Sequence, residues 1–252
     1  MNKLAELNHL LKIILELKTE PVGVFLLSDG SDPTPFQDWE RVSHHRYCQI
    51  LMKARAGQSV VLEAEELACP AAARAFGMRE LPEGLAGGKA LVGFGIVEKP
   101  ETGKRMFETM PRLEPGRVKS IAAAPLRECP AIPDVVVVEA EPEQLMWLLL
   151  ADLNLAGGER RTGNTAVLQA TCVDSTIIPF LENKINYSLG CYGCRDATDI
   201  GTNETIVGFP GSLLEPLAGV LGFLSEKAIP RSRAKGAYRN LTERKNEKEE
   251  GK

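Results

Sequence analysis

Short apolar runs, many of them rich in β-branched residues, are spaced along most of the chain between segments of helical periodicity. Runs of roughly four to eight apolar residues predict buried strands, whereas apolar residues at i, i+3 and i+4 predict amphipathic helices. Strands are expected at residues 21–27, 60–62, 90–97, 121–124, 135–138, 165–170, 185–189 and 204–209. Helices are expected at residues 4–17, 44–56, 69–76, 101–110, 141–149 and 212–224, and segment 172–181 is ambiguous. Because these elements do not alternate as regular βαβ units, we expect an α+β fold (or α/β), with mixed sheets flanked by helices.

The chain is long enough to bury a large core. At 252 residues it can form one compact unit, which we expect at residues 1–225. Residues 226–252 are charged and polar, and a segment of that composition cannot bury enough apolar surface to order itself. We therefore expect the tail to be disordered.

A weak internal sequence repeat suggests an alternative organisation in two similar halves, about residues 1–125 and 126–225. Similar apolar runs at residues 91–94 and 206–209 each follow a cysteine, Cys69 in the first half and Cys172 in the second. Two similar halves would place these two cysteines in comparable positions.

Charge and hydropathy exclude several classes of protein. Thirty Lys and Arg against 34 Asp and Glu give a net charge of −4, whereas nucleic-acid-binding domains are usually basic. No apolar stretch reaches the roughly 18 residues of a transmembrane helix, and the N-terminus lacks the features of a signal peptide. We expect a cytoplasmic protein that binds neither nucleic acid nor membrane. In that compartment the six cysteines are free thiols, metal ligands or catalysts rather than structural disulfides.

The sharpest local motif is the sequence GCYGCR at residues 190–195. Two thiols separated by two residues can bind a metal ion or an iron–sulfur cluster, or close into a reducible disulfide. The glycines, including Gly193, allow a tight turn that directs backbone N–H groups toward sulfur. Arg195 would lower the pKa of the thiols and offset the charge of a thiolate-ligated centre.

The remaining cysteines are candidate partners for Cys191 and Cys194. Cys48 lies early in an expected helix, and Cys69 precedes a proline at a helix start, a Cys–Pro step that recurs at cluster ligands. Cys172 begins the ambiguous segment, whereas Cys129, between prolines in a loop, is the weakest candidate. Zinc is less favoured, because there is neither a second CxxC motif nor a pair of histidines at zinc-finger spacing.

Several sequence blocks resemble a known family. They are PVGV at 21–24, RYCQ at 46–49, CPxA at 69–72, PDVVV at 133–137 and NYSLGCxGxR at 186–195, where x is any residue. Together they resemble domain of unknown function 169, an uncharacterised family found in anaerobic bacteria and archaea, over about residues 5–225. The resemblance implies no activity, but it places Cys48, Cys69, Cys172 and Cys191 inside the blocks and Cys129 and Cys194 at variable positions.

The leading hypothesis is a cytoplasmic protein with one cysteine-ligated iron–sulfur cluster, of the [4Fe–4S] type. Cys48, Cys69, Cys172 and Cys191 would be the ligands, with Cys194 as an alternate and Arg46, Gly193 and Arg195 around the cofactor. Its role would be electron transfer with a redox partner protein, or redox chemistry on a small molecule.

Two alternatives remain. The first is a non-redox binding protein that holds a small anionic metabolite near Arg46, Arg160 and Arg195. The second is a dithiol oxidoreductase that uses Cys191 and Cys194. The residues after Cys194 do not predict the long helix that usually lowers the pKa of the first thiol in such enzymes.

Overall fold

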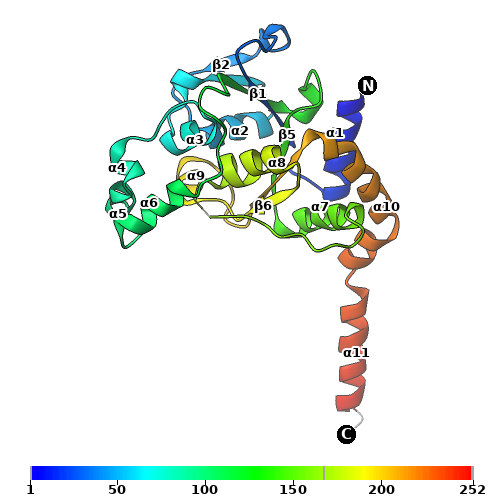
Figure 1. Cartoon of the computed structure of the whole chain (residues 1–252). Coiled ribbons are helices and arrows are strands. Elements are labelled where there is room, and N and C mark those ends of the chain that lie inside the picture. Colours follow the sequence, from blue (N-terminus) through cyan, green and yellow to red (C-terminus); the bar gives the residue numbers. More distant parts are fainter. Residues whose placement is uncertain (1, 167, 251–252) are drawn as a thin grey trace.

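The computed structural model describes residues 2–166 and 168–250. Within this part of the chain seven strands form one sheet in the order β2-β3-β4-β1-β5-β7-β6 (Figure 1). Neighbouring strands are antiparallel except for the pair β2 and β3, so the fold is α+β with a mixed sheet, as predicted. The strands are β1 Val22–Leu27, β2 Glu40–Val42, β3 Val60–Glu63, β4 Ser120–Pro125, β5 Val135–Ala140, β6 Asn186–Ser188 and β7 Thr205–Pro210.

Helices cover both faces of this sheet. The central strand β5 shows why, because its sequence VVVVEA is buried along its whole length. Val135 and Val137 belong to one core, and Val136 and Val138 belong to a second core on the opposite face. Apolar side chains on both faces of a strand require cover on both sides.

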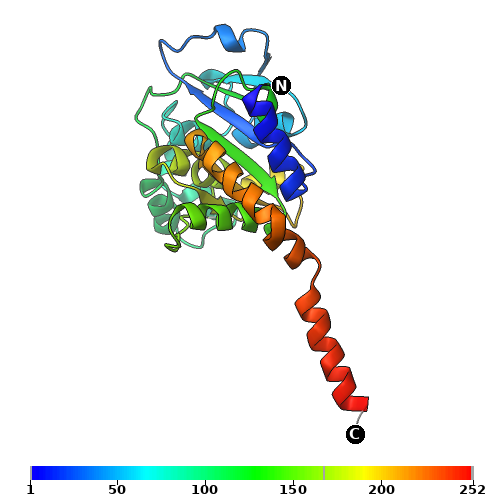
Figure 2. The ribbon, with the colours of Figure 1, turned by 90° about the vertical axis from the view of Figure 1, so that its right-hand side faces the viewer.

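The second core, which contains Val136, lies under three helices. They are α1 Lys3–Leu15, α7 Pro142–Leu155 and α10 Leu214–Arg233, and Figure 2 shows α1 and α10 lying across the strands. The first core lies under α2 Tyr47–Arg55, α3 Pro70–Ala75, α6 Pro100–Glu108 and the π-helix η4 Ala170–Ile177. The shorter elements are α4 Glu83–Ala86, α5 Lys89–Gly93, α8 Ile178–Glu182, α9 Tyr192–Ala197, and the 3₁₀ turns η1 Thr34–Phe36, η2 Ala64–Glu66, η3 Leu126–Glu128 and η5 Gly211–Leu213.

Two of the expected strands are wrong. Residues 90–97 form helix α5 and a following turn, since Gly88 enters the helix in a left-handed conformation that a strand does not allow. No strand is found in the described part of 165–170, where residue 167 lies outside the described residues and Ala170 begins η4. The ambiguous segment 172–181 is helical, as η4 followed by α8.

The C-terminal boundary also differs from the expectation. Helix α10 continues past residue 225 to Arg233, because Ile229 is buried and Arg233 pairs with Glu16 and Glu143. Helix α11 Gly236–Glu250 follows and points away from the body of the protein (Figure 1). None of the helices in the described residues combines the length and apolar character that crossing a bilayer requires.

The two segments of the weak internal sequence repeat differ in secondary structure. Residues 91–94 lie in and just after α5, whereas residues 206–209 lie in strand β7. One continuous sheet also runs through both expected halves, since β1 pairs with both β4 and β5.

Candidate functional site

A cavity of about 410 Å³ is lined by five of the six cysteines. They come from four separate segments of the chain and are Cys48, Cys69, Cys172, Cys191 and Cys194. The sixth, Cys129, is buried in the core on the opposite face of the sheet, against Gly23. The structure therefore brings the five stronger candidate ligands to one cavity and leaves out Cys129, the weakest candidate in the sequence.

Each of these cysteines lies at the beginning of a helix. Cys48 is in the first turn of α2, and Cys172 is in the first turn of η4. Cys69 caps α3, whose first residue is a proline, and Cys191 caps α9, with Cys194 in its first turn. A side chain at a helix start is directed toward that end, so four converging helices bring their thiols to one place.

Cys48, Cys191 and Cys194 form a small buried cluster with Ala170. The sulfur atoms of Cys191 and Cys194 lie 2.9 Å apart, and the backbone N–H of Cys194 donates to the sulfur of Cys191 over 3.2 Å. The hydroxyl of Thr171 contacts the sulfur of Cys194 at 3.0 Å. This end of the cavity thus holds three thiols in mutual contact range.

The thiols in the cavity are difficult to ionise. A hydrogen bond from the Cys191 thiol to Cys194, together with burial, raises the pKa of Cys191. The pKa of Cys194 is lowered by that bond but raised, to about 12, by a hydrogen bond with Cys48 and by burial. Burial and the neighbouring Cys69 raise the pKa of Cys172. Without a cation in the cavity these three thiols are neutral at neutral pH, and a bound metal would displace their protons.

Two side chains at the start of α2 hold it against α9. The guanidinium of Arg46 donates to the carbonyl of Gly193 over 3.1 Å, and the amide of Gln49 donates to the carbonyl of Ala197 over 3.2 Å. Both Arg46 and Gly193 line the cavity. These bonds fix Cys48 beside the CxxC motif.

Arg195 has a different role from the expected one. Its guanidinium donates to the carbonyl oxygens of Leu189, Gly201 and Glu204, over 2.6, 2.9 and 2.8 Å. It is not among the described residues that line the cavity, and neither is the exposed Arg160. Because three backbone acceptors occupy it, Arg195 fixes the loop between α9 and β7 instead of facing the thiols.

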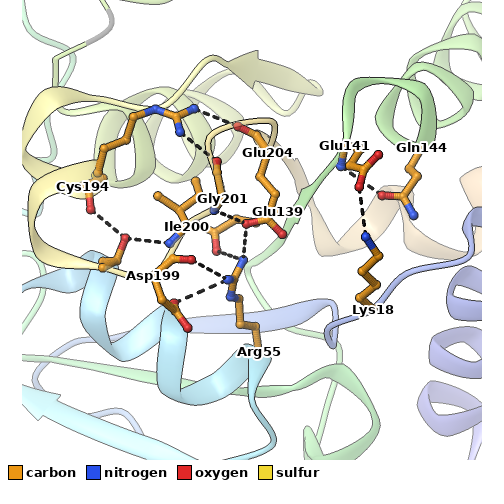
Figure 3. A network of polar contacts seen from close by, with 12 residues as sticks. Lys18, Arg55, Glu139, Glu141, Gln144, Cys194, Asp199, Ile200, Gly201 and Glu204 are labelled. Atoms are coloured by element: carbon orange, nitrogen blue, oxygen red, sulfur yellow. Dashed lines mark hydrogen bonds and ion pairs between the residues drawn. The ribbon is translucent and has the colours of Figure 1, made fainter.

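A network of polar contacts around the buried side chain of Arg55 holds the same loop from the side of the sheet (Figure 3). Arg55, in the last turn of α2, lies 3.3 Å from Glu139 on β5, 3.0 Å from Glu204 and 3.4 Å from Asp199. Burial raises the pKa of Glu139 to about 8, although the neighbouring Arg55 lowers it. No motif in the sequence predicted this network. Its one local signal is a single carboxylate, Glu139, at the end of an otherwise apolar run.

The π-helix η4 carries Cys172 and packs directly on the sheet. A Cβ atom at Gly208 of β7 would lie 1.8 Å from the carbonyl oxygen of Ser175, so only glycine allows this approach. The carboxylate of Asp174 accepts hydrogen bonds from Thr165 and Ser188, over 2.6 and 2.9 Å. π-Helical turns are rare and occur frequently at functional sites.

No three His, Cys, Asp or Glu side chains in residues 2–166 and 168–250 are arranged to hold a single metal ion. The five thiols therefore share a cavity without surrounding one common point. The fold and the site therefore define an α+β protein in which cysteines at the beginnings of four helices line one cavity.

Comparison with known proteins identifies the family. Residues 10–219 match domain of unknown function 169, described as uncharacterised ArCR, and the chain belongs to this family, as its sequence blocks predicted. The chain is 30% identical to "Uncharacterized protein MJ0308" of Methanocaldococcus jannaschii over 174 aligned residues. The aligned region covers 68% of this chain and 74% of that protein. No solved structure matches the chain. All five cysteines of the cavity lie within the matched residues.

Proposed function

We propose that this is a cytoplasmic iron–sulfur protein whose cavity thiols hold one cluster, of the [4Fe–4S] type. The ligands are Cys48, Cys69, Cys172 and Cys191, with Cys194 as an alternate. The observation that carries the proposal is the gathering of five thiols from four segments around one cavity, while Cys129 lies on the other face of the sheet. A cytoplasmic protein keeps such thiols reduced and available to a metal.

The contacts of Cys191 favour it over Cys194 as a ligand. Its sulfur accepts hydrogen bonds from the backbone N–H groups of Cys194 and Ala170, and such bonds tune the potential of cluster sulfurs. With their sulfur atoms 2.9 Å apart, Cys191 and Cys194 are too close for each to bind a different iron. One of the two therefore serves as ligand and the other as its neighbour.

A single zinc ion and a [4Fe–4S] cluster make different demands on the positions of the thiols. Tetrahedral zinc with bonds of about 2.3 Å to sulfur holds its thiolates about 3.8 Å apart around one point. The described residues offer no such closed set. Four thiolates on a cluster each bind a different iron, so they stand farther apart around a larger centre. The cavity of about 410 Å³ has room for that centre.

The cluster would supply one-electron transfer, either to a redox partner protein or to a small molecule in the same cavity. The chain contributes the low-polarity lining and the N–H groups directed at sulfur, both of which set the potential of a cluster. Arg195 and the Arg55 network would keep the ligand-bearing loop rigid during this exchange.

Iron and acid-labile sulfide in protein purified without oxygen test the proposal. We expect both in the wild-type chain, and loss of most of the iron when Cys48, Cys69 or Cys172 is changed to Ser. The matched control is Cys129→Ser, which changes an equally buried thiol outside the cavity and keeps the iron. A colourless wild-type protein, or equal iron loss in the control, would contradict the proposal.

One contact favours a second candidate function, that of a dithiol oxidoreductase. The 2.9 Å between the sulfurs of Cys191 and Cys194 suits a pair that forms a disulfide. Against it, the pKa of both thiols is raised, and α9 is only six residues long. Alkylation of Cys191 as a function of pH separates the two: a thiol that ionises below pH 8 supports the oxidoreductase.

A further inference from the structure

The cavity extends beyond the thiols, beneath the three short helices α4, α5 and α6. Six side chains made of carbon alone line this part of the cavity. They are Leu85, Leu91, Phe94, Ile96, Phe107 and Leu168. Sulfur therefore lines one end of the cavity, and most of the remaining lining is hydrocarbon, with polar atoms supplied by Gln169, Thr171 and two tyrosines, Tyr47 and Tyr192.

Charge is confined to the rim. Among the described lining residues the charged ones are Arg46 and Asp196, which lie 3.9 Å apart with exposed side chains. Because these two charges offset each other, the cavity without a bound metal offers no net charge to a ligand. Burying an ion there without a partner is strongly unfavourable, so a charged ligand is disfavoured.

Helices α4–α6 form a unit that packs chiefly on itself, at the edge of the molecule away from the sheet (Figure 1). Gly88 and Gly103 bring α5 and α6 into backbone contact, since a Cβ atom at Gly88 would lie 1.9 Å from the carbonyl oxygen of Pro100. Leu91 and Phe107 anchor the unit to the core, both nearly inaccessible to solvent.

Phe94 of this unit is 63% exposed although it lines the cavity. A large aromatic side chain at the mouth of an apolar cavity loses contact with water when a ligand binds there, and it offers that ligand a broad apolar surface. The volume of about 410 Å³ lies in the range of small-molecule sites, roughly 300–1,000 Å³.

We propose that α4–α6 is a lid over a binding site for a neutral, predominantly apolar small molecule, held between the lid and the thiols. The ligand class follows from the hydrocarbon walls and the absence of net charge among the described lining residues. Binding of this molecule does not depend on the proposed function. Its further role as the substrate of the cluster rests on the proposed function.

Two probes with the same ring system test the ligand class. N-phenyl-1-naphthylamine is neutral, and 1-anilinonaphthalene-8-sulfonate differs from it by one sulfonate. Equilibrium dialysis against the full chain, purified without oxygen, avoids quenching of the probes by iron. We expect saturable binding of one neutral probe per chain, at least about tenfold tighter than binding of the sulfonate.

Two variants locate the site. Phe94→Ser removes an exposed side chain that the core does not need, and we expect it to weaken binding of the neutral probe at least fivefold. The matched control is Phe223→Ser on α10, where the side chain is 68% exposed and does not line the cavity; its affinity stays at the wild-type value. Equal weakening in the control would overturn the site.

Tighter binding of the sulfonate, lost in Arg46→Gln, would overturn the ligand class in favour of an anionic metabolite. The inference and the proposed function fail separately. Iron and sulfide without binding of the neutral probe overturns the inference alone. Binding of the neutral probe to a chain that never acquires iron supports the inference and overturns the proposed function.

Discussion

Gly208→Ala is expected to displace the π-helix that carries Cys172. The new Cβ atom would lie 1.8 Å from the carbonyl oxygen of Ser175, whereas such contacts are essentially never below 3.0 Å, so the backbone must move by at least about 1.2 Å. Overpacking of this kind costs about 1–3 kcal/mol. If that cost falls on η4, its opening becomes roughly fivefold to 150-fold more frequent, because 1.4 kcal/mol corresponds to about a factor of ten.

The assay is the rate at which Cys172 is alkylated in protein stripped of metal, measured for each peptide by mass spectrometry. Cys172 is 6% exposed in the wild type, so its rate reports opening of η4, and we expect an increase in the range given above. Cys129 in the same chain is an internal control and keeps its rate. Gly219→Ala is the matched control, since no atom lies within 4 Å of its Cβ and alanine favours a helix interior. An unchanged Cys172 rate in Gly208→Ala would refute the reasoning.

Three further variants test the contacts that hold the site. The first concerns Glu139, which ionises near pH 4.5 in the unfolded chain but at about 8 in the folded one, so the free energy of unfolding should fall between pH 5 and 8 by up to roughly 1.4 kcal/mol per pH unit. Urea titrations across this pH range should show a smaller fall for Glu139→Gln than for the wild type. An equal fall in the two proteins would contradict the assignment to Glu139. Gln49→Leu removes both the bond to Ala197 that joins α2 to α9 and the capping bond from the backbone N–H of Arg46. It should lower the free energy of unfolding in urea by about 1–2 kcal/mol, whereas no loss would mean that neither bond stabilises this contact. Arg195→Lys should lower the free energy of unfolding by about 1–3 kcal/mol, because an ammonium group cannot reproduce the planar guanidinium that donates to three carbonyl oxygens. The matched change Arg160→Lys, at an exposed residue, should have no measurable effect. Equal effects of the two substitutions would refute the role given to Arg195.

The parts of the fold that followed from sequence are those where burial is complete. Strands β1, β4 and β5 are apolar enough to be recognised locally because they are covered on both faces. Strand β2, with the sequence ERV at the edge of the sheet, gives no such signal. Residues 90–97 have a strand-like composition, but they lie at the periphery and follow a left-handed glycine, Gly88, so composition predicts the wrong element there.

The site was predictable in part for a similar reason. The CxxC motif is local. Two of its neighbours in space, Cys48 and Cys69, stand out because they fall in distinctive blocks, whereas Cys172 begins a segment whose secondary structure is ambiguous in the sequence. The orientation of Arg195 was not predictable, because its three acceptors are backbone carbonyls that any sequence provides. The pairing of Arg55 with Glu139 joins residues 84 positions apart, which no local pattern reveals.

Iron K-edge X-ray absorption of the anaerobically purified chain tests the central claim most directly. The account predicts iron surrounded by sulfur, with a second shell of neighbouring iron atoms, and loss of both shells in Cys172→Ser but not in Cys129→Ser. Iron bound through nitrogen and oxygen alone, or a chain that takes up zinc in place of iron under the same conditions, would contradict it.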